Sequence, residues 1–154
     1  MNHAGDVAAR LPISNHPLLE RCGDIQFKEW LEHPDYDDYW QAIAPCERYA
    51  QVKVPALNFG GRYDLFLGGT LVNYAAMKGR TQQRLVIGPW VHGYNGGVYP
   101  ERNFGLMAHD GVADVTAEQI RWFDHHLKGE ANGVPGDKPV KIFVMGPDAW
   151  REED

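Results

Sequence analysis

The hydrophobic pattern along the chain predicts a strand–helix–strand unit in its middle. Residues 52–59 (V-K-V-P-A-L-N-F) form a short apolar run that ends at two glycines, and residues 84–87 form a second such run. Between them, residues 70–77 carry apolar side chains at helical spacing. Near-continuous apolar strands are typical of a parallel sheet covered on both faces. The pattern therefore predicts a β-α-β unit with a right-handed crossover.

A second helix is predicted after this unit. Residues 117–127 show a helical period, with Thr116 as the cap at the start and Gly129 as the glycine that ends the helix. Its apolar stripe comprises Ile120, Phe123 and Leu127.

A third strand and a long loop complete the second half. Residues 140–145 (V-K-I-F-V-M) form another short apolar run and predict a strand. Residues 94–114 are rich in glycine and show no period, so we expect a long loop. Loops of this length inside a compact domain are often functional.

The first part of the chain has a different pattern. Residues 25–40 carry aromatic and apolar side chains at helical spacing. Pro34 interrupts them, because a residue before proline avoids helical backbone. We expect two short helices, the second with Asp35 as its N-cap.

Composition and charge exclude several classes of function. The chain has 154 residues, of which 44% are hydrophobic and 23% charged, and this suits one globular domain with a real core. The net charge of −6 argues against nucleic acid or an anionic membrane as the main partner, because both attract basic surfaces. The sequence lacks an apolar run of about 18 residues, so no transmembrane helix is expected.

The cysteines favour a reducing compartment. Cys22 and Cys46 do not have the spacing of metal ligands, and we expect reduced, partly buried thiols. Free thiols are typical of cytoplasmic proteins, and residues 1–10 lack the apolar core of a signal peptide. A cytoplasmic location is therefore expected, and no cofactor is predicted.

Two side chains with catalytic potential follow the two predicted strands of the unit. Asp64 comes after two glycines and an aromatic residue, and His92 lies in G-P-W-V-H-G. In open α/β sheets, ligand chemistry lies at the carboxyl ends of strands, and neighbouring parallel strands end side by side. An Asp that accepts the Nδ1–H of a His is two-thirds of a Ser-His-Asp triad. The alternative for Asp64 is a capping role before the helix, and the alternative for His92 is a hydrogen-bonded loop histidine.

The third member of a triad is missing from the sequence. No G-x-S-x-G nucleophile turn occurs, and the single serine, Ser14, lacks both flanking glycines and a preceding strand. Cys22 and Cys46 show no nucleophile context either.

Metal sites are not predicted. His125 and His126 are adjacent on a predicted helix, so their side chains point about 100° apart. Coordination of one metal ion by both side chains is therefore difficult. The acidic residues 35, 37 and 38 fit the start of a helix better than a calcium loop.

Four blocks of sequence resemble the X-Pro dipeptidyl-peptidase and cocaine-esterase family. They read V-P-A-L-N-F-G-G-R-Y-D, L-V-I-G-P-W-V-H-G, R-W-F-D-H-H-L-K-G and P-V-K-I-F-V-M-G-P-D-A-W-R, and they occur in family order. The segment H-P-D-Y-D-D-Y-W resembles the stretch that leads out of the family's lid. Members are serine hydrolases with an α/β-hydrolase domain, an inserted helical lid and a C-terminal jelly-roll domain.

The resemblance implies a fold class and a division of the chain. The fold class is α/β: a partial α/β-hydrolase fold with about three mostly parallel strands and helices, preceded by short lid-derived helices. Residues 1–50 would be lid-derived, residues 51–146 the C-terminal part of the hydrolase domain, and residues 147–154 the start of a linker to a further domain. The family's nucleophile turn and oxyanion hole would precede this stretch.

The resemblance also implies site residues. Asp64 matches the triad acid and His92 the triad base. Arg62, Tyr63 and Trp90 flank them and are candidates for the wall of a substrate pocket. Arg62 stands where the family usually has tryptophan.

Two functions from different classes are compatible with these patterns. The first is a fragment of a serine hydrolase that acts on a small-molecule ester, amide or peptide, with esterase or dipeptidyl-peptidase activity in the parent and none in this chain alone. The second is a non-catalytic interaction or assembly module, because an exposed sheet edge invites a second copy or a complementing N-terminal chain. A metal-dependent hydrolase built on Asp64 and His92 lacks a recognisable third ligand.

Overall fold

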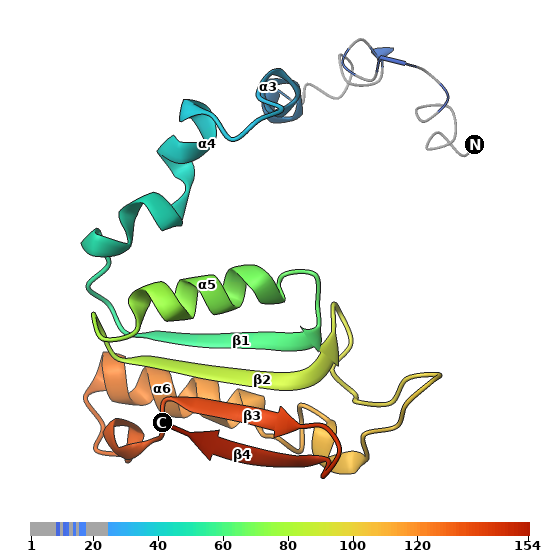
Figure 1. The fold of residues 1–154 in the computed structure, drawn as a ribbon. Coiled ribbons are helices and arrows are strands. Elements are labelled where there is room, and N and C mark those ends of the chain that lie inside the picture. The colour runs from blue at the N-terminus through green and yellow to red at the C-terminus, as the bar shows by residue number, and fades with distance from the viewer. Residues whose placement is uncertain (1–8, 10, 13, 15, 18–24) are drawn as a thin grey trace. The chain divides into compact units, whose positions relative to one another are not determined.

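The computed structural model describes residues 9, 11, 12, 14, 16, 17 and 25–154 (Figure 1). The chain divides into two compact units, Met1–Arg48 and Tyr49–Asp154. The second unit holds the sheet. Among the described residues, no helix has the length and apolar character that crossing a membrane requires.

The first unit contains short helices, as predicted. Helix α3 spans Ile25–Glu32 and α4 spans Asp38–Ile43. A kinked 3-10 segment, η2 (Pro45–Gln51), crosses the boundary between the two units. The predicted cap, Asp35, was wrong: the N-cap of α4 is Asp37, whose carboxylate accepts the N–H of Tyr39. The second carboxylate oxygen of Asp37 lies 2.6 Å from His33 Nδ1, so both oxygens of Asp37 take part in hydrogen bonds.

The second unit is built on a four-stranded sheet in the order β1-β2-β3-β4, which confirms the α/β class. The strands are β1 (Ala56–Tyr63), β2 (Gln83–Val91), β3 (Val140–Val144) and β4 (Ala149–Glu153). The first three are parallel. Helix α5 (Leu67–Met77) connects β1 to β2, as the β-α-β pattern predicts.

Strand β4 was not predicted. It pairs antiparallel with β3, and Gly146 and Asp148 turn the chain between them with φ values of 112° and 50°. The strand reads A-W-R-E-E, and its charged residues hide the alternation that identifies a half-buried strand. Residues that we expected to begin a linker therefore belong to the sheet.

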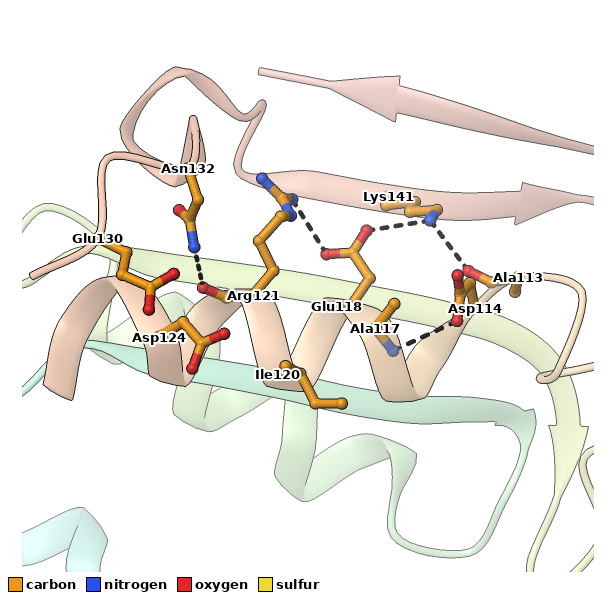
Figure 2. A pocket seen from close by; sticks show the side chains of 10 residues that line it. All are labelled: Ala113, Asp114, Ala117, Glu118, Ile120, Arg121, Asp124, Glu130, Asn132 and Lys141. Carbon is orange, nitrogen blue, oxygen red and sulfur yellow. Dashed lines mark hydrogen bonds and ion pairs between the residues drawn. The ribbon is translucent and has the colours of Figure 1, made fainter. Parts of the chain in front are cut away.

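Helix α6 (Val115–Lys128) follows the long loop and covers the other face of the sheet from α5 (Figure 2). Gly129 ends it in left-handed backbone, as predicted, but the N-cap is Asp114 rather than Thr116. The three residues of the predicted apolar stripe are exposed. Ile120, Phe123 and Leu127 are 56%, 55% and 78% exposed, whereas Trp122 is buried.

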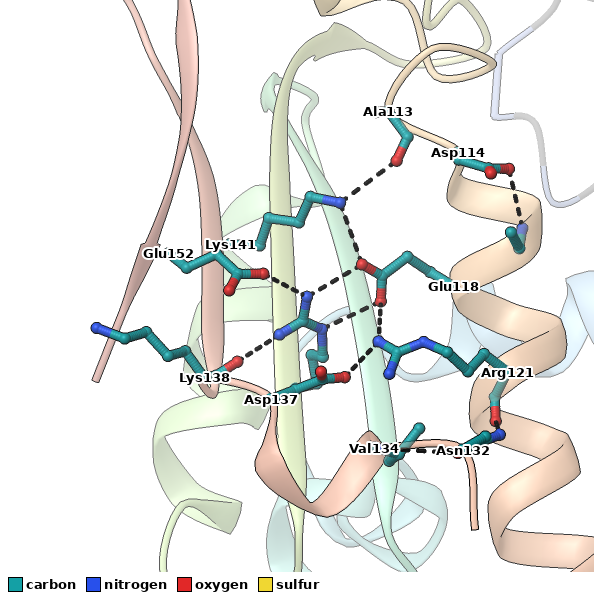
Figure 3. A network of polar contacts seen from close by, with 12 residues as sticks. Ala113, Asp114, Glu118, Arg121, Asn132, Val134, Asp137, Lys138, Lys141 and Glu152 are labelled. Atoms are coloured by element: carbon teal, nitrogen blue, oxygen red, sulfur yellow. Dashed lines mark hydrogen bonds and ion pairs between the residues drawn. The ribbon is translucent and has the colours of Figure 1, made fainter. Parts of the chain in front are cut away.

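A network of charged side chains occupies the inner side of α6 (Figure 3). Arg84 of β2 is 3% exposed, and its guanidinium donates to Glu118 at 3.2 and 3.0 Å and to Glu152 of β4 at 3.0 Å. Lys141 of β3 donates to Glu118 at 3.1 Å, and Arg121 pairs with Asp137. The network therefore joins three strands to one helix.

Glu118 is the centre of this network. Burial by itself raises the pKa of Glu118, but the hydrogen bonds from Arg84 and Lys141 outweigh burial and hold the pKa below its usual value. A buried arginine without its carboxylate is costly, because its charge has left water without compensation. The ion pairs therefore tie α6 to the sheet even though the helix turns its apolar stripe outward.

We expect Glu118→Ala to lower the free energy of unfolding by up to about 3–5 kcal/mol, because it leaves the buried Arg84 with Glu152 as its one remaining carboxylate partner among the described residues. The loss should be present near neutral pH and should shrink as the pH falls through the depressed pKa of Glu118, since a protonated Glu118 no longer compensates Arg84. Urea unfolding at several pH values measures the loss of stability and its dependence on pH. The control is Glu153→Ala, which removes an exposed ion pair with Arg151 and should cost less than about 1 kcal/mol. Equal losses in the two variants would contradict the role of the network.

Candidate functional site

The ends of β1 and β2 bring Asp64 and His92 together. Tyr63 and Val91 are the last residues of their strands and are partners in the parallel register. Asp64 and His92 follow directly, and His92 Nδ1 lies 3.2 Å from Asp64 Oδ2. With the proton on Nδ1, the imidazole donates to the carboxylate and leaves Nε2 for a reacting group. This is the arrangement of the acid and base in a Ser-His-Asp triad.

A tight turn after β1 positions Asp64. Its second oxygen, Oδ1, accepts the backbone N–H of Phe66 at 2.7 Å, and its own N–H bonds Gly61 O at 3.1 Å. Helix α5 begins directly afterwards, and its N-cap residue, Phe66, offers no side-chain cap. The carboxylate thus stabilises the approach to the helix and contacts the histidine at the same time.

The electrostatics of Asp64 follow from these contacts. The N–H of Phe66 is the main cause that lowers the pKa of the carboxyl group, burial opposes it, and the hydrogen bond from His92 lowers the pKa further. The carboxylate is therefore ionised at neutral pH, which an orienting acid requires.

A second turn positions His92. Val91 and Tyr94 bond each other's backbone at 3.3 and 3.4 Å, and Gly93 supplies a φ of 77° between them. The ring of Phe66 packs edge-on against the imidazole, with ring centroids 5.2 Å apart. The histidine side chain is 61% exposed, so its ring is open to a reacting partner.

A cavity of about 320 Å³ adjoins the two strand ends. Its lining residues are Tyr63, Val91, Tyr99, Pro100, Glu101, Arg102 and Phe104. Tyr63 and Val91 immediately precede Asp64 and His92 in the chain, so the cavity opens at the same edge of the sheet.

Comparison with known proteins establishes the family. Residues 3–94, which include both Asp64 and His92, match the profile of the X-Pro dipeptidyl-peptidase (S15) family. The chain belongs to this family.

The relatives of this chain described next are hydrolases, and the chain spans about a quarter of the length of each. It is 37% identical over 153 residues to the cocaine esterase of Rhodococcus sp. (strain MB1 Bresler), covering 99% of this chain and 27% of the esterase. A selenomethionine-labelled α-amino acid ester hydrolase superposes with a TM-score of 0.62 and 31% identity over 87% of this chain and 24% of its own. An aminopeptidase from a marine sediment Thaumarchaeota archaeon superposes with a TM-score of 0.63 at 24% identity, over 89% of this chain and 24% of its own, and this likeness concerns the fold alone.

The three residues predicted to line a pocket, Arg62, Tyr63 and Trp90, lie in different surroundings. Tyr63 is 52% exposed and lines the cavity. Trp90 instead lies in the core, 3% exposed, where it packs with Val86 and Ala113 and donates to Ala108 O at 2.7 Å. Arg62 is exposed and does not line the cavity.

Asp64 and His92 are called the dyad below. The other residues considered as nucleophiles or metal ligands are distant from the dyad in the sequence. Ser14 and Cys46 belong to the first unit, and both are exposed. The expectation of a partly buried Cys46 was therefore wrong, and Cys22 lies outside the described residues. Among the described residues, no group of three metal-binding side chains occurs, and His125 Nδ1 lies 2.8 Å from Glu130 O.

A larger cavity of about 460 Å³ lies along α6 (Figure 2). Glu118, Arg121 and Lys141 line it, and these charged groups already pair within the network described above. None of its lining residues adjoins Asp64 or His92 in the chain.

The sequence alone did not single out Phe66, Tyr99 or Phe104. Phe66 contacts both members of the dyad, and its position two residues after Asp64 was the available signal. Tyr99 and Phe104 lie in the aperiodic loop, where no pattern indicates which side chains turn inward.

We expect His92→Gln to raise the pKa of the Asp64 carboxyl group and still leave it below its usual value, because the Phe66 N–H remains. A pH titration of the Asp64 carboxyl carbon by NMR measures this. His109→Gln, which removes the ring beside Asp110, should leave the Asp64 titration unchanged. A His92→Gln variant with an unaltered pKa at Asp64 would contradict the hydrogen bond between them.

Proposed function

We propose that this chain supplies the acid and the base of a serine-hydrolase triad that transfers the acyl group of an ester or amide. The observation that supports it is the 3.2 Å contact between His92 Nδ1 and Asp64 Oδ2 at the ends of adjacent parallel strands. Family membership and the named activity of the Rhodococcus esterase favour an ester or amide bond as the target.

Each member of the dyad has a defined task. Nε2 of His92 takes the proton from a nucleophile's hydroxyl while the hydroxyl oxygen attacks the carbonyl carbon. The imidazolium then gives this proton to the leaving alcohol or amine as the acyl bond breaks. Water repeats the sequence on the acyl-enzyme and releases the acid. Asp64 holds the tautomer with Nδ1–H and stabilises the imidazolium at both stages.

The nucleophile comes from outside these residues in this proposal. Ser14 is the only serine in the sequence, and no G-x-S-x-G turn surrounds it. The 154 residues by themselves should therefore be inactive, because a dyad without nucleophile and oxyanion hole lacks the groups that form and stabilise the acyl-enzyme.

We expect the purified chain to hydrolyse p-nitrophenyl acetate no faster than its His92→Ala variant, and to remain unlabelled by a fluorophosphonate. Absorbance at the nitrophenolate band and intact-mass spectrometry measure the two outcomes. The Rhodococcus cocaine esterase serves as the positive control under the same conditions. Turnover that His92→Ala abolishes, or a fluorophosphonate adduct on Ser14, would contradict an inactive isolated chain.

A second candidate function is assembly with another polypeptide, and the edge of the sheet favours it. β1 is the outermost strand in the sheet order, and its outer edge pairs with no strand among the described residues. The strand reads A-L-N-F-G-G-R-Y, and Arg62 is its only charged residue, so the edge carries little of the charge that blocks pairing. The occupant we propose is a complementing N-terminal chain that brings the serine, because this chain spans about a quarter of its relatives' length.

Co-expression with the part of the Rhodococcus esterase that precedes the matched stretch tests this assembly. The two polypeptides should co-purify and show esterase activity that neither has alone. Asp64→Asn should remove the activity and leave the association intact, because the carboxylate does not belong to the pairing edge. A self-associated chain that excludes the second polypeptide, as seen by light scattering, would contradict the complementing partner and favour a homodimer.

A further inference from the structure

We propose that His33 and Asp37 form an acid-sensitive clasp that holds helices α3 and α4 together. The pair closes the connection between the two helices, residues 33–37, and protonation of the carboxylate opens it. The clasp belongs to the first unit and is independent of the proposed function.

The clasp is a direct contact between two side chains. His33 Nδ1 lies 2.6 Å from Asp37 Oδ2, a separation that suits a hydrogen bond to an ionised carboxylate. The other oxygen, Oδ1, accepts the backbone N–H of Tyr39 at 3.0 Å and so caps α4. One carboxylate therefore caps the start of α4 and also holds the residue that follows α3.

Further contacts join the same two helices. The indole Nε1 of Trp40 donates to His33 O at 2.7 Å. Tyr39 Oη donates to Glu29 of α3 at 3.3 Å, and Trp30 of α3 packs against Trp40 with ring centroids 6.3 Å apart. Because the indole bonds the backbone of His33, its hydrogen bond depends on the place that the clasp gives to this residue.

The imidazole of the clasp has a defined orientation. The ring of Tyr39 stacks on it, with centroids 4.3 Å apart and planes 7° from parallel. Pro34 disfavours helical backbone at His33, because a residue before proline avoids that conformation. The stacked ring and the extended backbone together direct Nδ1 toward the carboxylate.

The same local arrangement occurs at the dyad. In each pair an aspartate before a helix accepts the N–H of the residue two positions later and faces a histidine Nδ1. In each pair that later residue also packs its aromatic ring against the imidazole. The arrangement thus serves at a helix connection as well as at the strand ends.

The electrostatics of Asp37 make the clasp sensitive to acid. The hydrogen bond from His33 is the main cause that lowers the pKa of the Asp37 carboxyl group, burial opposes it, and the remaining contacts lower it further. A depressed pKa of an acid means that the contact contributes stability above the ordinary pKa and loses it as the pH falls through the lowered one. The clasp is therefore closed near neutral pH and opens in acid.

The other titratable groups that face the clasp or its connection come from α3, α4 and η2. They are Glu29 of α3, Tyr36 of the connection, Asp38 and Tyr39 of α4, and Cys46 and Glu47 of η2. In the described part of the chain, none of these side chains hydrogen-bonds the carboxylate of Asp37 or the ring of His33. The side chains of the pair are 33% and 43% exposed, so solvent protons reach them.

NMR of the whole chain tests the clasp at two atoms. The carboxyl carbon of Asp37 reports its protonation, and the indole N–H of Trp40 reports the bond to His33 O. We expect hydrogen exchange of the indole, corrected for the intrinsic effect of pH, to become about threefold to tenfold faster once Asp37 is protonated. A hydrogen bond of ordinary net strength shifts an exposure equilibrium by about this factor.

Matched variants separate the clasp from the start of the helix. His33→Phe keeps a ring for Tyr39 but removes Nδ1, so the pKa of Asp37 should rise toward its ordinary value and the indole should exchange faster already at neutral pH. Asp37→Asn keeps an N-cap side chain and should make indole exchange independent of pH. Asp35→Asn changes an acidic residue of the same connection that is not the N-cap, and should preserve the pH response.

Three results would overturn the clasp. They are equal titration of Asp37 with and without His33, constant indole exchange while Asp37 titrates, and a pH response that survives in Asp37→Asn. None of these measurements involves ester turnover or the dyad, so they stand apart from the tests of the proposed triad.

Discussion

The parallel pairing of β1 with β2 is the constraint on which the site depends. The two backbones approach so closely near the strand ends that a Cβ at Gly61 would lie 2.5 Å from the carbonyl oxygen of Trp90. Glycine is required there, and the register that it permits places Tyr63 opposite Val91. Asp64 and His92 each follow by one residue. A slip of one position along either strand would point the side chains to other faces and separate carboxylate from imidazole.

Asp64 shows that a structural role and a chemical role can share one side chain. One oxygen accepts the Phe66 N–H and holds the turn that leads into α5, and the other faces His92. The turn fixes the carboxylate in space without help from the histidine. Because both oxygens are engaged, the carboxylate has a defined direction, and this is the property that an orienting acid needs. The capping alternative and the catalytic interpretation are therefore compatible.

Helix α6 inverts the usual relation between burial and polarity. Its period predicted an apolar stripe, and the residues of that stripe, Ile120, Phe123 and Leu127, are exposed, whereas Glu118 bonds the buried Arg84. Periodicity reports that a helix has two different faces, but it does not report which face the protein covers. Here the covered face carries Trp122, which is buried, and Glu118, which pairs with Arg84 of β2.

The sequence by itself determined the α/β class and the β-α-β unit, and it predicted that Asp64 and His92 meet at the ends of adjacent strands. These features are local, since apolar period, glycine punctuation and the order of acid and histidine lie within short stretches. Tertiary structure alone decided the rest. Pairing with β3 makes a strand of the charged segment A-W-R-E-E. Trp90 lies in the core whereas Tyr63 lines a cavity, and residues of an aperiodic loop complete the aromatic wall. The physical reason is that burial and pairing depend on which distant segments meet, and such contacts leave no local pattern.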